Sequence, residues 1–129
     1  MEKTELLIKL REYLFSGEIA KGVYIDVNVE KEPRYSPVGF LLKEFGLSDL
    51  DLVYLTESMK STLDIKGLLT GEVKLPERIV NKVKVPLTFL GFNEADLSLL
   101  EEKNDGLVHE ELYIAIFDLL NNDQFDYNN

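Results

Sequence analysis

Apolar residues recur at intervals of three and four in several stretches of the chain, and this spacing is typical of helices with one buried face. In the first stretch, residues 5–15, the buried face is predicted to consist of four leucines, Leu6, Leu7, Leu10 and Leu14. Thr4 is a candidate N-cap of this helix, and Gly17 is suited to its C-terminal end. The pattern therefore predicts an amphipathic helix at the start of the chain.

A second helix is predicted to begin at Ser36-Pro37, because serine caps helix N-termini and proline suits the first helical position. Its apolar face consists of Val38, Leu41, Leu42 and Phe45. Gly46 is its predicted end. Gly39 lies inside the helix, where glycine lowers stability by up to about 1 kcal/mol relative to alanine. A glycine at this position indicates that another stretch of backbone packs closely against the helix.

The period changes to two in residues 23–29, which predicts a half-buried strand. Its buried face is predicted to consist of Val23, Ile25, Val27 and Val29. Residues 83–89 are a candidate second strand, which Pro86 would confine to a sheet edge. Between these stretches, Ser48 or Asp49 could cap a further helix, and Pro76 suits the start of a short one.

The C-terminal part of the chain contains two more predicted helices. Asn93 followed by acidic residues is a good helix start, and Leu97 and Leu100 form the core face of that helix. The last helix is predicted over residues 109–120, and its apolar residues span half of its circumference or more. Such a helix lies either in the centre of the fold or at an interface between subunits, and the sequence leaves both interpretations open.

These elements predict an α+β fold that is mostly α, a compact single domain of four to five short helices with a small β ribbon. The domain is predicted to cover residues 1–121, and residues 122–129 are predicted to form a flexible acidic tail. Nine apolar residues are predicted to be almost fully buried: Leu10, Leu14, Val38, Leu41, Leu42, Leu97, Leu100, Ile116 and Leu119.

Charge is distributed unevenly along the 129 residues. Residues 1–92 hold 13 basic and 14 acidic side chains, whereas residues 93–129 hold 1 basic and 10 acidic ones. Because no basic stripe is present, direct nucleic-acid binding is not expected, and anionic membranes would repel the C-terminal part. An acidic surface of this kind serves solubility or attracts a basic partner, and the sequence does not decide between the two.

Composition excludes several kinds of site. The chain has no cysteine and one histidine, so neither a disulfide framework nor a common zinc site is expected. The acidic start of the chain is unlike a signal peptide, and no apolar run has the ~20 residues of a membrane span, which together predict a cytoplasmic protein.

Candidate catalytic groups are weak. His109 stands beside Glu110 and Glu111 at a helix start, which is typical of a surface residue and not of a catalytic base. The Arg34-Tyr35 pair could hold a phosphate but is more typical of a surface turn. No phosphate-binding glycine loop or calcium loop is present, so no cofactor is expected.

The order of the segments resembles a group of short, uncharacterised proteins of bacteria and their phages. The matching stretches are LREYLFSGEIAKG, YSPVGFLLKEFG, VKLPERIV, FLGFNEADLSLLEEKNDG and the final helix. Ser36 replaces the usual cysteine of the group and Phe89 replaces a frequent tryptophan, so the resemblance implies no thiol chemistry. It implies the same order of elements and a phage or mobile-element setting, and it supplies no active site.

These observations favour a non-enzymatic protein that binds another protein, as a regulator or inhibitor of a host or defence factor. The sequence leaves open whether the partner is basic, and a homodimer is an alternative. The residues predicted to contact the partner are Tyr113, Phe117, Leu120, Glu101, Glu102, Asp118 and Asp123. A small enzyme with a carboxylate-based divalent-metal site, or a purely structural role in an assembly, are the other functions that the sequence leaves open.

Overall fold

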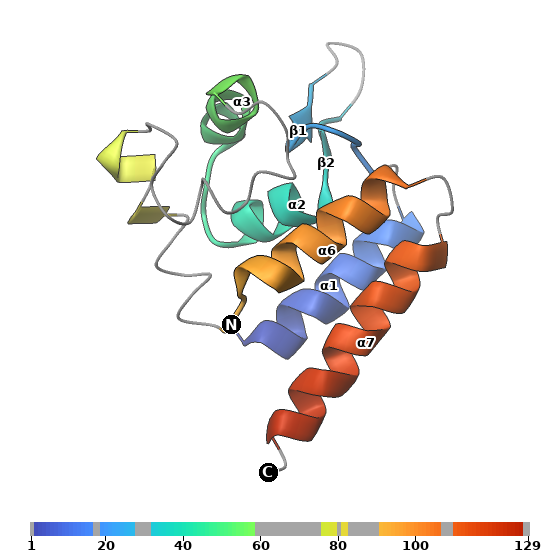
Figure 1. The fold of residues 1–129 in the computed structure, drawn as a ribbon. Coiled ribbons are helices and arrows are strands. Elements are labelled where there is room, and N and C mark those ends of the chain that lie inside the picture. Colours follow the sequence, from blue (N-terminus) through green and yellow to red (C-terminus); the bar gives the residue numbers. More distant parts are fainter. Residues whose placement is uncertain are drawn as a thin grey trace.

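The computed structural model describes most of the chain as a mostly helical fold with a two-stranded antiparallel hairpin (Figure 1). The described residues are 2–16, 19–27, 32–58, 76–79, 81–82, 91–106 and 110–127, the last six of these and Ser16 by their backbone only. The elements are α1 (Lys3–Ser16), β1 (Ile25–Asp26), β2 (Arg34–Tyr35), α2 (Pro37–Glu44), α3 (Asp49–Ser58), α6 (Glu94–Asp105) and α7 (Glu110–Tyr127). This confirms the predicted fold class.

Five helices of the described residues contribute side chains to the core. α1 and α6 each pack against both α2 and α7, while α3 packs against α2 and β1. Figure 1 shows α6, α1 and α7 running side by side, with α2, α3 and the hairpin to one side of them. All nine residues predicted to be buried are at most 6% exposed, which confirms the core prediction. Tyr24 and Phe92 are the largest side chains that are fully buried in it.

α2 begins and ends as its sequence predicts. The Ser36 hydroxyl accepts a hydrogen bond from the Gly39 N–H at 3.1 Å, and Pro37 occupies the first turn. At the other end Gly46 has a φ of +105°, and Leu47 donates its N–H to the carbonyl of Leu42 at 3.1 Å. This bond spans five residues and closes the helix C-terminus, where glycine adopts the left-handed conformation without strain.

Two other helices begin with reciprocal side-chain caps. In α6, Asn93 Oδ1 accepts from the Asp96 N–H at 2.9 Å, and Asp96 Oδ2 accepts from the Asn93 N–H. Ser48 and Asp51 form the same pair at α3, which confirms Ser48 as its cap. The prediction for α1 is wrong by two residues, because the helix begins at Lys3 and Thr4 lies inside it.

The hairpin differs from the predicted ribbon. β1 pairs with Arg34–Tyr35, a segment that lacks the alternating pattern of a strand, and residues 83–89 lie outside the described residues. The predicted buried face is confirmed at Ile25, which is 4% exposed, but it is wrong at Val27, which is 56% exposed, and Tyr24 is fully buried. Val29 lies outside the described residues. The backbone bends over residues 21–24 before the strand begins, so side chains there do not follow a period of two.

The inference drawn from Gly39 is confirmed. A Cβ atom at this position would overlap the carbonyl group of Tyr24, in the segment that leads into β1. The same carbonyl accepts a hydrogen bond from the Ser36 N–H at 3.2 Å. The start of α2 therefore lies directly on the hairpin, and the absence of a side chain at residue 39 allows this contact.

The C-terminal end of α6 holds the chain that follows α1. Asn104, which is 2% exposed, donates from Nδ2 to the carbonyl of Ala20 at 2.7 Å. Asp105 accepts from the Gly22 N–H at 3.1 Å. These contacts join segments more than 80 residues apart in the sequence, and they fix one end of the helix layer.

α7 is longer than the apolar pattern indicates. It continues through Tyr127, whereas the predicted helix ends at Leu120. The flexible tail over residues 122–129 stays a prediction. Among the described residues, no helix combines the length and apolar character that crossing a membrane requires.

Candidate protein-binding surface

One face of α7 is buried and the opposite edge is open. Five residues form the buried face: Leu112, Ala115, Ile116, Leu119 and Leu120. They pack against α1 and α6, so the helix is part of the core. Ile114 and Phe117 are each 58% exposed. α7 is therefore a core helix, as one interpretation of its sequence predicts, and it also presents apolar side chains at the surface. Its place at a subunit interface stays a prediction.

The exposed apolar side chains of α7 continue onto α1. The rings of Phe15 and Tyr113 are 5.1 Å apart between centroids with their planes tilted by 35°. Phe117 follows Tyr113 by one helical turn, and residues four apart on a helix lie next to each other. Phe15 is 73% exposed even though its ring contacts the ring of Tyr113. We call this group of Phe15, Tyr113, Ile114 and Phe117 the α1–α7 strip.

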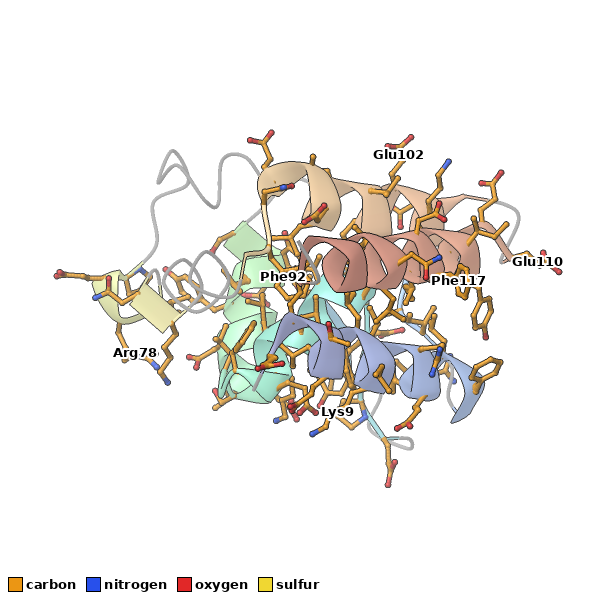
Figure 2. All side chains as sticks on the ribbon, turned by 90° about the horizontal axis from the view of Figure 1, so that it is seen from below. Lys9, Arg78, Phe92, Glu102, Glu110 and Phe117 are labelled. Carbon is orange, nitrogen blue, oxygen red and sulfur yellow. The ribbon has the colours of Figure 1, made fainter. Side chains whose placement is uncertain are left out.

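Acidic side chains flank the strip. Glu110, Glu111 and Asp118 of α7 are exposed, and α7 contains no lysine or arginine. Glu102 of α6 is also exposed, and Figure 2 shows it and Glu110 directed away from the helices. Lys103 lies 3.9 Å from Glu111 and offsets the charge of that one acid, and the sequence holds no other basic residue after position 92.

Three of the seven residues predicted to contact a partner lie on α7 at this surface, and a fourth, Glu102, is exposed on α6. Tyr113, Phe117, Glu102 and Asp118 are exposed or half-buried on α6 and α7. Asp123 is in the helical backbone of α7, but its side chain lies outside the described residues. Phe15 was missed because it falls at the end of α1, and only the fold brings it against Tyr113.

Two of the predicted contact residues are buried in the core. Leu120 is 6% exposed, and Glu101 is completely buried. Glu101 Oε1 accepts a hydrogen bond from the Val38 N–H at 2.8 Å, so the carboxyl group caps the N-terminus of α2. The prediction that Glu101 contacts a partner at the surface is therefore wrong. The buried face of α6 consists of Leu97, Leu100, Glu101 and Asn104. Their spacing of three and four residues is the sequence signal that indicates a buried Glu101.

A polar cluster lies at the junction of β2, α2 and α3. Tyr35 donates its hydroxyl to Asp49 at 2.8 Å, and Lys43 lies 2.9 Å from the same carboxylate. The Lys43 ammonium lowers the pKa of Asp49, and burial together with Asp49 raises the pKa of Tyr35. Both shifts hold the groups in their ordinary protonation states, so the cluster ties three elements together and offers no activated nucleophile.

Asp51 at the start of α3 acts in a similar way. It is 4% exposed and contacts Arg78 at 3.1 Å and Lys82 at 3.7 Å. Burial raises the pKa of Asp51, but the hydrogen bonds from Ser48 and Arg78 outweigh burial and the net pKa is lowered. The carboxylate thus ties Arg78 and Lys82 to the start of α3.

Within the described part of the chain, no three or more histidine, aspartate or glutamate side chains gather closely enough to hold a metal ion. The Arg34-Tyr35 pair lies in β2, with Tyr35 engaged by Asp49 and by Tyr13. Comparison of the chain with protein-family models, with curated proteins and with solved structures found no match. Among the described residues, the exposed apolar side chains of α1 and α7 are therefore the feature that best indicates a function.

Proposed function

We propose that the protein is non-enzymatic and acts by binding another protein through the α1–α7 strip and the acidic side chains beside it. The observation that carries this proposal is the exposure of Phe15, Ile114 and Phe117 by 58–73% on neighbouring helices. Aromatic side chains supply much of the binding energy at protein interfaces, and their exposure to water is unfavourable without a partner.

The resemblance to short proteins of bacteria and phages supports the biological setting of the proposal. A small acidic protein from such a setting would act by occupying a surface of a larger host or defence factor, as its regulator or inhibitor. The uneven charge supports the choice of a basic partner, because Glu102, Glu110, Glu111 and Asp118 are exposed and the last 37 positions hold Lys103 as their one basic residue.

Affinity capture from cells of the natural host tests the proposal. The wild-type chain is expected to retain a specific protein, and Phe117→Asp is expected to lose it while remaining folded, because the Phe117 side chain is 58% exposed. Leu50→Asp is the matched control, since Leu50 is 81% exposed on α3. Circular dichroism of both variants should match that of the wild type.

The opposite pattern would contradict the proposal. Loss of the retained protein with Leu50→Asp but not with Phe117→Asp would place the binding surface on α3. If Phe117→Asp unfolds the chain, the Phe117 side chain is needed for the core, and the proposal that it contacts a partner is wrong.

The rate of association with the captured partner is expected to depend on the acidic side chains. Changing Glu102, Glu110 and Glu111 to glutamine and Asp118 to asparagine should slow association about tenfold or more at low salt and change dissociation much less. Stopped-flow measurements over a range of salt concentration check this. For the wild type the association rate should fall as the Debye length shrinks below about 10 Å. An association rate that does not depend on salt would contradict this prediction and would mean that the acidic side chains serve solubility only.

A further inference from the structure

We infer that the partner segment which covers the α1–α7 strip is a basic amphipathic helix and not a second copy of this chain. The inference rests on the proposed function and specifies the chemistry of the partner. The charges around the α1–α7 strip and the spacing of the side chains in the strip support this inference.

Charge disfavours a symmetric dimer through the strip. In a two-fold symmetric contact the same patch of both copies meets, so α7 would lie near α7 of the second copy. Glu110, Glu111 and Asp118 of both copies would then share one interface, where α7 supplies no basic residue and Lys103 of α6 offsets Glu111 alone. On α1, Arg11 and Glu12 precede Phe15 and cancel each other in charge. A partner that carries lysine or arginine beside its apolar residues matches this surface, and a second copy does not.

The spacing of the strip favours a helical partner. Tyr113 and Phe117 are four residues apart and Ile114 and Phe117 are three apart, so together they form a ridge along α7. Ridges of this kind pack into the grooves between side chains of a second helix. The backbone groups in the middle of a helix are already hydrogen-bonded, so α7 offers no edge to which a partner could add a β-strand.

The aromatic side chains set where the partner would bind most strongly. Phe15 and Tyr113 contact each other, and Phe117 adjoins Tyr113 along α7. Apolar side chains of the partner helix would cover these rings, while its flanking lysines or arginines would approach Glu110 and Asp118. The exposed aromatic rings thus provide affinity, and the acidic side chains select the sign of the partner charge.

Binding of a designed peptide tests the inference. The probe is a fluorescent peptide of about 18 residues with leucine at the a and d positions of each heptad and lysine at the other positions. We expect the wild-type chain to bind it with micromolar affinity. Phe117→Ser should weaken binding about tenfold or more, and Leu50→Ser should leave it unchanged. A scrambled peptide of the same composition, and one with glutamate in place of lysine, should bind at least about tenfold more weakly.

Four results would overturn the inference. Equal binding of the ordered and scrambled lysine peptides would show unspecific charge attraction. Equal binding by wild type and Phe117→Ser would place the peptide elsewhere. A dimer of the wild-type chain in sedimentation equilibrium that Phe117→Ser dissociates would show that a second copy covers the strip. If capture of the host protein depends on Phe117 while the peptide does not bind, the inference fails and the proposed function stands. If capture is independent of Phe117, the proposed function fails whatever the peptide does.

Discussion

Replacing Gly39 by alanine is expected to destabilise the protein by about 3 kcal/mol or more. Alanine is normally the better residue inside a helix, by about 1 kcal/mol relative to glycine. Here the added Cβ atom would overlap the carbonyl group of Tyr24, and a backbone group cannot move aside as the end of a flexible side chain can. Relief of the overlap would separate α2 from the hairpin and weaken the hydrogen bond from the Ser36 N–H to the same carbonyl.

Chemical denaturation of Gly39→Ala and of a matched control measures this effect. Gly106 is suitable as the control, because its φ is −70° and a Cβ there would lie 3.4 Å from its nearest neighbour, the Lys103 carbonyl oxygen. Gly106→Ala should change the free energy of unfolding by less than about 1 kcal/mol. A neutral or stabilising Gly39→Ala would mean that helix propensity dominates at this site, and that the start of α2 does not lie against Tyr24.

The features that the sequence predicted correctly depend on short stretches of chain. Leu41 and Leu42 are buried because the spacing of apolar residues selects one face of a helix, whatever lies against that face. Ser36 and Asn93 cap their helices because a side-chain oxygen reaches the N–H three residues later. Even the contact at Gly39 was indicated locally, because a helical glycine lowers stability unless close packing requires it.

The features that the sequence missed depend on residues far apart. Nothing in Arg34 and Tyr35 indicates a strand, and they become β2 because the chain folds back against Ile25 and Asp26. Tyr24 is fully buried and its backbone lies between the start of α2 and Thr56 of α3, which the alternation of residues 23–29 does not reveal. Pairing and coverage of this kind follow from the whole fold and not from local propensity.

The candidate binding surface was predicted in part for the same reason. The sequence identified α7 as unusually apolar, but a helix that is apolar around half of its circumference does not show which edge stays open. The positions of α1 and α6 decide this, because they cover Leu120 and leave Phe117 exposed. The sequence also grouped Glu101 with Glu102, although neighbouring residues on a helix point about 100° apart.

Replacing Glu101 by alanine is expected to lower the free energy of unfolding by about 2–4 kcal/mol, because two losses combine. The Val38 N–H would lose its acceptor at 2.8 Å, in a place where the Glu101 side chain is completely buried and water has no ready access. The missing side chain would also leave a cavity between α6 and α2. Since Val38 and Glu101 are 63 residues apart, the contact is one of those that join the two halves of the chain.

Two variants give this prediction its controls. Glu101→Gln retains an acceptor oxygen and nearly the same volume, so it should recover part of the stability that Glu101→Ala loses. Glu102→Ala removes the neighbouring acid, which is exposed, and should change stability by less than about 0.5 kcal/mol. Urea denaturation of the three variants compares them directly. Equal and small effects of Glu101→Ala and Glu102→Ala would contradict the buried cap, and would return Glu101 to the acidic surface on which the sequence placed it. A large effect confined to Glu101 would instead mean that one of two adjacent acids holds α2 in place while the other remains available to a basic partner.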